Sequence, residues 1–230
     1  MGRIEPRGGV VRVSGPSRPS VVISKLRVKE GERVEVGQVI AVLDTHEVQA
    51  AEVTRLRAEV RNSERDYQRQ RTLRDRGALS AAGLESWLLK RDVARANLQR
   101  ARAELEQSSV VSPVSGRVLD VHTRNGERVG PEGIVEIGET SAMYAIAEVY
   151  ETDIGRVKIG QRATIRSPAL AGPLEGTVER IGLKIGKKDI LSSDPVAATD
   201  ARVVEVEIVL DASAPVAMLT NLTVEVEIQP

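Results

Sequence analysis

The sequence predicts a mainly β protein that carries one α-helical hairpin, and three observations point to this fold class. The phrase Gly-Glu-Arg-Val occurs at residues 31–34 and again at 126–129, each copy beside a strand-like alternation of apolar residues. The segment between the two copies changes to helical periodicity. After residue 140 the chain alternates apolar and polar residues in short runs, which is typical of antiparallel strands with one buried face. We therefore expect a split β sandwich with an inserted helical hairpin, followed by a small antiparallel β-barrel.

The two halves of the expected sandwich are residues 21–44 and 109–140. Ahead of them, residues 9–14 alternate and precede a Gly-Pro-Ser-Arg-Pro break at 15–19. This pattern predicts a short strand followed by a turn.

Glycine turns with alternating Val and Ile in these halves are typical of lipoyl and biotinyl carrier domains, so we expect a lipoyl-like sandwich. Carrier domains present a modifiable Lys at the turn that joins their halves. Here the hairpin replaces that turn: Asp44-Thr45 leads away, Ser112-Pro113 returns, and neither junction holds a Lys. We therefore expect no prosthetic group and no cofactor.

Residues 45–108 predict two helices joined by a short turn. Asp44 and Glu47 have capping-box spacing, so we expect Asp44 to cap the first helix, and Ser112-Pro113 to end the second. Seam residues recur at heptad spacing in both helices, which predicts an antiparallel coiled coil. They are Val53, Leu56, Val60, Ser63, Tyr67 and Gln70 in the first helix, and Leu84, Trp87, Arg91, Ala94, Leu98, Ala101, Leu105 and Ser108 in the second.

The remaining sequence, residues 1–20 and 141–230, is assigned to the barrel. Glu151–Ile154 predicts one short helix. Strands are expected at residues 144–150, 161–167, 174–181, 203–210 and 223–228.

Composition argues against several functional classes. Lys plus Arg equals Asp plus Glu at 33 each, so no net field recruits nucleic acid. The chain has no Cys, which removes disulfides and thiolate chemistry. No apolar run approaches the roughly 20 residues that span a bilayer.

The sequence contains few candidates for metal-binding, phosphate-binding or catalytic residues. His46 and His122 are the only histidines, and neither has a second nitrogen ligand at metal spacing, so surface or cap-adjacent roles are favoured. Residues 182–188 weakly resemble a phosphate loop, but a glycine-rich turn between strands is the better interpretation. We expect no metal site, no catalytic residues and no enzyme activity.

The order of these elements resembles the periplasmic adaptor, or membrane fusion, proteins of the HlyD-like family. Members that dock on TolC-like outer-membrane channels carry an Arg-x3-Leu-x6-Ser signature at the hairpin tip. Arg69, Leu73 and Ser80 reproduce that spacing, with Gly77 between the two helices. The resemblance implies that these residues form a channel-docking tip.

Each tip residue also has a simpler interpretation. Arg69 would contact a channel, or be one of several solvated arginines. Leu73 would either meet a channel helix or close the hairpin seam. Ser80 would dock or cap the second helix. Gly77 is expected to supply a positive φ, and Trp87 a contact in the seam.

Five blocks further resemble DevB-type adaptors of ABC exporters. They are Arg3–Pro6, Val149–Ile154, Gly182–Asp189, Asp200–Val204 and Leu219–Leu222. The resemblance implies a periplasmic protein held by an N-terminal inner-membrane segment that is absent from this sequence. Its implied partners are an inner-membrane ABC permease, a TolC-like channel and further copies in a hexameric ring. Glycolipid is the implied cargo.

Three alternatives stay open from sequence: an adaptor of a proton-driven multidrug efflux pump, a carboxylase or dehydrogenase carrier domain, and a cytosolic coiled-coil scaffold. An ABC permease partner, a modified Lys, or the absence of any membrane segment before Arg3 would separate them. The cargo, the ring stoichiometry and the cognate channel are not encoded in any motif that we recognise.

Overall fold

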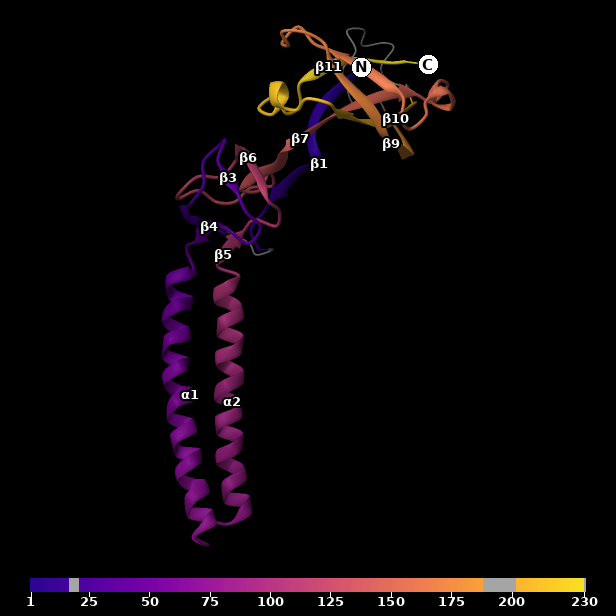
Figure 1. Ribbon diagram of the computed structural model, residues 1–230. Helices are drawn as coiled ribbons and strands as arrows, with labels where there is room; N and C mark the ends of the chain where they lie inside the picture. The colour runs from indigo at the N-terminus through magenta and orange to yellow at the C-terminus, as the bar shows by residue number, and fades with distance from the viewer. Residues whose placement is uncertain (17–20, 188–201, 230) are drawn as a thin grey trace.

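A computed structural model describes residues 1–16, 21–187 and 202–229 of the chain and has three parts in a row (Figure 1). A helical hairpin projects from a β sandwich, and a β-barrel lies on the opposite side of the sandwich. Both chain ends lie at the barrel (Figure 1). The fold class predicted from the sequence is confirmed.

Six antiparallel strands form the barrel, in the order β1-β11-β8-β9-β10-β7, and β1 pairs with β7 to close it. The strands are β1 (Gly2–Val13), β7 (Val135–Tyr150), β8 (Arg162–Arg166), β9 (Leu174–Lys187), β10 (Arg202–Leu210) and β11 (Thr223–Ile228). Two short 3-10 helices, η1 (Ile154–Arg156) and η2 (Ala214–Val216), lie in the connections. Inward-facing Ile, Val and Ala side chains fill the barrel, with Ile4, Ile165 and Ile208 fully buried.

The sandwich has two small sheets. Strands β3 (Arg33–Val34) and β6 (Gly116–Val121) continue the barrel sheet along β7, while β2 (Ile23–Leu26), β4 (Val39–Leu43) and β5 (Ser109–Val111) form the second sheet. The two strand-forming halves on either side of the hairpin therefore pair in space: β4 bonds to β5, and β3 to β6. Their core is a separate cluster around Ile23, Ile40 and Ile134.

Strands β1 and β7 run through both the sandwich and the barrel. In β1, Ile4 packs in the barrel core and Val13 packs in the sandwich core. The short strand expected at 9–14 is thus the end of a longer one, and the strand expected at 144–150 is the end of a 16-residue strand. Domain boundaries at residues 20 and 140 stay a prediction, because the hydrogen-bonded ladder continues across both parts.

Four turns share one construction, and the repeated phrase encodes two of them. In residues 29–32 the Glu32 N–H donates to the Lys29 carbonyl (3.1 Å), and the Glu32 carboxylate accepts a hydrogen bond from the Lys29 N–H (3.0 Å). Residues 124–127, 35–38 and 158–161 repeat both bonds, with Glu or Gln as the acceptor. In each turn the third residue is a glycine with φ between +81° and +91°, a conformation that side chains disfavour.

These turns join the two halves of the sandwich. The turn at 29–32 exchanges two backbone hydrogen bonds with Val118 of the second half, at 2.8 and 2.9 Å. The turn at 124–127 exchanges two with Ile23 of the first half, at 2.7 and 3.0 Å. Each half therefore completes the backbone hydrogen bonding of the other, and neither half has its full set alone.

The hairpin consists of α1 (His46–Asp75) and α2 (Ala81–Glu106). The predicted Asp44 cap is wrong: Thr45 precedes α1 without a side-chain cap bond, and the Asp44 N–H still bonds to the carbonyl of Val22 in the sandwich (3.1 Å). The predicted stop at Ser112-Pro113 is also wrong, because the preceding residues leave the helix early to pair with β4.

The predicted seam is confirmed near the sandwich. Val53, Leu56, Leu98 and Ala101 form a buried cluster there, and the predicted seam residues Ala94 and Leu84 are buried farther toward the tip.

A further correction concerns Gly182, which was expected in a turn but lies inside β9. The ladder with β10 shifts register at this point, and a Cβ on Gly182 would lie 2.8 Å from the Glu205 carbonyl oxygen. The glycine allows this close approach of two strands. Lys188, the last residue of that motif, lies outside the described residues.

The turn construction generates a prediction for stability. Replacing Glu127 by Ala removes the acceptor for the Arg124 N–H (2.7 Å), and we expect the free energy of unfolding to fall by about 1 kcal/mol. Glu127→Gln is the matched control, because Gln38 and Gln161 supply the same bond in their turns. Urea unfolding of the three proteins checks this, and equal losses in both variants would contradict it.

Candidate functional site: the hairpin tip

The tip is the end of the molecule farthest from the barrel (Figure 1). Helix α1 ends at Asp75 and α2 begins at Ala81, so a five-residue turn connects them. Arg69 and Leu73 are four residues apart on α1 and therefore lie on the same helix face. The structure brings the four predicted site residues to this one end of the hairpin, two on the helix and two in the turn.

Gly77 closes the end of α1. Its φ is +77°, its N–H donates to the Arg74 carbonyl (2.8 Å), and the next N–H, of Ala78, donates to the Leu73 carbonyl (2.9 Å). These two bonds form a Schellman motif, in which a glycine adopts the left-handed conformation. The predicted positive φ of Gly77 is confirmed.

Ser80 caps α2. Its Oγ accepts a hydrogen bond from the Gly83 N–H (3.1 Å), which confirms the capping interpretation. Gly83 itself was not singled out from the sequence. A Cβ at that position would lie 2.8 Å from Leu79 Cδ1, so the glycine makes room for Leu79 to fold over the first turn of α2. A glycine inside a helical pattern was the available signal.

Arg69 and Leu73 are presented to solvent. The Arg69 side chain is 70% exposed, and its guanidinium lies 3.6 Å from the Asp66 carboxylate. Such an exposed pair contributes little and leaves most donors of the guanidinium available. Leu73 is 36% exposed, whereas the seam residue Leu56 is 4% exposed. Leu73 is therefore not sealed in the seam.

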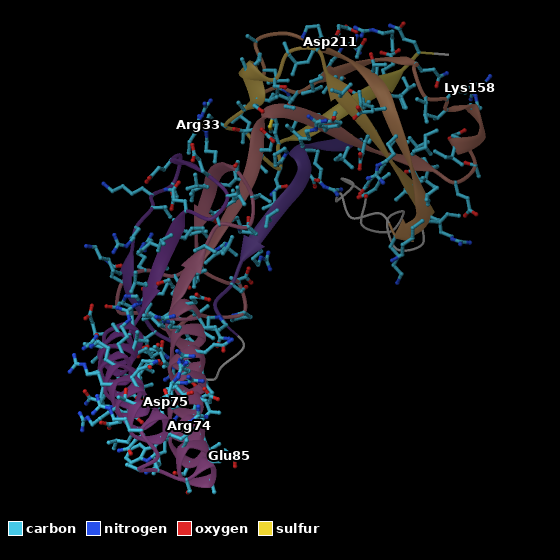
Figure 2. The ribbon with its side chains drawn as sticks, turned by 60° about the horizontal axis from the view of Figure 1, so that its bottom comes forward. Arg33, Arg74, Asp75, Glu85, Lys158 and Asp211 are labelled. Atoms are coloured by element: carbon cyan, nitrogen blue, oxygen red, sulfur yellow. The ribbon has the colours of Figure 1, made fainter. Side chains whose placement is uncertain are left out.

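The tip carries an excess of exposed arginines. Figure 2 shows Arg74, Asp75 and Glu85 at this end, and Arg74 pairs with Asp75 at 3.0 Å. Arg71 and Arg76 make no ion pair with any described residue. The surface near Arg69 can thus accept an acidic partner.

Polar contacts hold the distal half of the hairpin together. The Arg91 guanidinium covers the Tyr67 ring at 4.5 Å, and its hydrogen bond to Asp92 raises the pKa of Arg91. Trp87, predicted to contact the seam, is half-buried, and the Lys90 ammonium lies 4.2 Å from its ring centroid. The Arg91–Tyr67 contact links the two helices beside the buried apolar residues Leu84 and Ala94.

The two histidines lie away from the tip and make local polar contacts. His46 Nδ1 lies 2.8 Å from Ser108 Oγ at the root of the hairpin, and His122 Nε2 lies 3.3 Å from the Glu136 carboxylate. Within residues 1–16, 21–187 and 202–229, no three His, Asp or Glu side chains gather as a metal site. None of the helices in this part of the chain has the length and apolarity that crossing a bilayer requires.

The blocks that resemble DevB-type adaptors lie in the barrel wherever the structure describes them. Residues 188–189 and 200–201 of these blocks are outside the described residues. Two blocks are in direct contact: the Asn221 N–H donates to the Ile4 carbonyl at 2.7 Å. The blocks and the tip signature therefore occupy opposite ends of the molecule.

A family model described as "RND MFP, barrel-sandwich hybrid domain", where MFP stands for membrane fusion protein, matches residues 12–133. That range contains strands β2 to β6 of the sandwich and the whole hairpin.

Two curated proteins and one solved structure show the same similarity. The chain is 28% identical over 177 residues to the nickel-cobalt-cadmium resistance protein NccB of Alcaligenes xylosoxydans xylosoxydans, covering 72% of this chain and 44% of NccB. It is 30% identical over 137 residues to the multidrug resistance protein MdtN of Escherichia coli O6:H1, covering 59% of this chain and 40% of MdtN. The chain therefore spans less than half the length of these relatives.

The solved structure is a MacA–MexA chimeric protein that contains the Pseudomonas aeruginosa MexA α-hairpin domain. It matches with a TM-score of 0.78 at 22% identity, over 99% of this chain and 76% of that one. This likeness shows the shared fold.

The cap geometry generates a prediction for the tip. Ser80→Ala leaves the Gly83 N–H without its acceptor, so we expect its amide hydrogen to exchange about five times faster, corresponding to about 1 kcal/mol of lost capping. Ser80→Asp retains a side-chain acceptor and serves as the control. Hydrogen exchange followed by NMR measures both variants, and unchanged exchange in Ser80→Ala would refute the capping role.

Proposed function

The chain belongs to the membrane fusion protein family, and on that premise we propose that it is the periplasmic adaptor subunit of a tripartite exporter. In this proposal the adaptor is held at the inner membrane and links a transporter there to an outer-membrane channel. The barrel faces the transporter, the sandwich packs against neighbouring copies, and the hairpin tip meets the channel. The protein supplies a physical connection, and a partner supplies the energy.

The observation that carries this proposal is that a long helical hairpin separates two exposed surfaces, the tip and the barrel. Helix α1 has 30 residues, which corresponds to about 45 Å at 1.5 Å per residue. The hairpin leaves the sandwich on the side away from the barrel, so its tip and the barrel face opposite directions (Figure 1). A connector needs this geometry.

We place the channel contact at Arg69 and Leu73. They share one face of α1, Arg69 is largely exposed and Leu73 partly so, and the flanking exposed arginines add positive charge. A guanidinium next to an apolar side chain suits a channel end that offers carboxylates or backbone carbonyls beside an apolar groove. Ser80 and Gly77 shape the turn that presents this face.

An ABC-type permease is the proposed transporter and a TolC-like protein the proposed channel. The DevB-like blocks support the permease, because they gather in the barrel at the end remote from the tip. Six copies in a closed ring and a glycolipid cargo complete the proposal. In a ring of this kind, one face of each copy contacts a different face of its neighbour, and the ring closes because the rotation between neighbours divides a full turn.

The second candidate is an adaptor of a proton-driven multidrug efflux pump, and the similarity to MdtN, named a multidrug resistance protein, favours it. The architecture suits both candidates equally. Affinity purification of the tagged protein from its native membranes separates them: an ABC permease in the complex supports the first candidate, and a proton-driven transporter supports the second.

Charge reversal at the tip tests the docking role. We expect Arg69→Asp to lower export at least about tenfold, because it removes a donor and adds a carboxylate next to Asp66. Arg71→Asp changes the neighbouring exposed arginine by the same charge and should affect export less. Circular dichroism should show unchanged helix content in both variants.

Crosslinking identifies the partner directly. A cysteine placed at Leu73 should crosslink in cells to an outer-membrane channel protein, since the wild-type chain contains no Cys to compete. A cysteine at exposed Val48, near the root of the hairpin, is the control and should give no channel adduct. Normal export by Arg69→Asp together with no adduct at Leu73 would remove the docking role.

A further inference from the structure

Strand β9 continues beyond its neighbour β8 and forms a two-stranded ribbon with β10. Residues 174–177 pair with β8, whereas the ladder with β10 continues to Lys187. The last part of β9 therefore has β10 on one side and no strand of the described residues on the other. Figure 1 shows this end of the ribbon on the side of the barrel away from the sandwich.

A bulge in the ribbon presents apolar side chains to solvent. The register shifts between Val204 and Val206, where residues 182–184 of β9 lie opposite a single residue of β10. Leu183, inside this bulge, is 102% exposed, and Ile185 is 41% exposed. A bulge of this kind changes the direction in which a side chain points. Because Leu183 is fully exposed, it adds nothing to the packing of the barrel and is available to a partner.

The same stretch of β9 is strongly basic. Residues 180–187 contain Arg180, Lys184 and Lys187 and no acidic residue. The Arg180 guanidinium pairs with Glu207, whereas Lys184 and Lys187 make no ion pair with a described carboxylate. The chain as a whole has a net charge of zero, so the excess of positive charge is a local property of the ribbon.

The turn at residues 158–161 adds to this surface. Its Gly160 N–H donates to the Val178 carbonyl of β9 at 2.8 Å, which ties the turn to the strand. Ile159 in the turn is 68% exposed. Arg156 and Lys158 beside it are exposed and make no ion pair with a described carboxylate. Figure 2 shows Lys158 on the side of the barrel away from the sandwich, as is the end of β9.

Acidic residues near this turn only partly offset the positive charge. The Glu151 carboxylate lies 3.4 Å from the Arg202 guanidinium, so that pair is already neutral. Asp153 is exposed in the same connection and opposes an anionic partner. The ribbon and the turn together thus keep an excess of exposed cations next to exposed aliphatic side chains.

We propose that this surface contacts a lipid bilayer with anionic headgroups. We call it the basic barrel face, and it consists of Arg156, Lys158, Ile159, Leu183, Lys184 and Lys187. Leu183 and Ile159 enter the boundary between headgroups and acyl chains, and the cations lie among the lipid phosphates. The inference goes beyond the adaptor function and does not depend on which transporter or channel the protein serves.

A bilayer fits this face better than an acidic protein does. The aliphatic side chains stand singly on two separate segments, and lysines lie between and beside them. Protein–protein interfaces are depleted in lysine, whereas lysines with long flexible stems are common where proteins meet membranes. Each such cation near an anionic leaflet contributes to binding without requiring a complementary shape.

Vesicle flotation tests the proposal with the full chain. The chain should float with phosphatidylglycerol vesicles and bind phosphatidylcholine vesicles at least about tenfold more weakly, because zwitterionic headgroups offer no net charge. Added salt should weaken the binding to phosphatidylglycerol, since the cations are exposed.

Matched variants locate the contact. The double variant Lys184→Gln/Lys187→Gln should bind phosphatidylglycerol vesicles about tenfold or more weakly, and Leu183→Ser about tenfold more weakly. Arg124→Gln, at an exposed arginine of the sandwich, and Leu89→Ser, at a leucine of α2 that is 65% exposed, should bind like the wild type. Because the substituted side chains are exposed, all four variants should keep the wild-type midpoint of urea unfolding.

A fluorescent label reports the insertion itself. The chain contains no Cys, so Leu183→Cys can carry a single NBD group, whose emission moves to shorter wavelength in hydrocarbon. We expect this shift on phosphatidylglycerol vesicles. The same label at Val48→Cys, near the root of the hairpin and 73% exposed in the wild type, should not shift.

The expected lipid preference, the emission shift at residue 183 and the weaker binding of both ribbon variants together support the proposal. It is overturned if the chain does not bind phosphatidylglycerol vesicles, if phosphatidylcholine binds equally well, if the label at residue 183 does not shift, or if either ribbon variant binds like the wild type. A crosslink in cells from residue 183 to an acidic protein, without vesicle binding, would also overturn it and assign the face to a protein partner. These outcomes are independent of export and of the hairpin tip.

Discussion

The reciprocal hydrogen bonding between the two halves of the sandwich is the constraint on which the rest of the structure depends. The turn at 29–32 bonds to Val118, and the turn at 124–127 bonds to Ile23. Because each half completes the other, the connection between them is not needed to hold the sandwich together. Its two ends need only lie side by side, as they do where the Leu43 N–H donates to the Ser108 carbonyl (2.9 Å). The connection can therefore be an entire hairpin.

The hairpin in turn shows a gradient of packing from root to tip. Apolar side chains around Leu56 and Leu98 form a buried cluster near the sandwich, whereas the distal part buries isolated apolar residues such as Leu84 and adds the contact of Arg91 over Tyr67. Burial of apolar surface is the larger stabilising term, and exposed polar pairs add little. The distal part is thus the less stable half by itself, and it is also the part that presents Leu73 to solvent. A partner at the tip would gain contacts and stabilise the hairpin at once.

Local signals in the sequence succeeded where a residue acts on its near neighbours along the chain. Gly77 and Ser80 end and begin helices through bonds within five residues, so their roles could be predicted. The same kind of signal failed at Asp44, at Ser112-Pro113 and at Gly182. In each case the backbone bonds to a segment more than 20 residues away in the sequence, and this pairing overrides the local preference.

The sequence by itself determined the repeated turns, the heptad seam and the order of the three parts, because periodicity and turn chemistry are local properties. It also placed the Arg69, Leu73 and Ser80 signature at a hairpin tip, although what that tip contacts stays a prediction. Only the tertiary structure decided that β1 and β7 continue through both sandwich and barrel, since the length of a strand depends on its neighbours in the sheet. The approach of Arg117 in the sandwich to Thr220 in a barrel loop, which line one cleft, likewise has no signal in the sequence, because these two residues are 103 positions apart and meet only when both parts have folded.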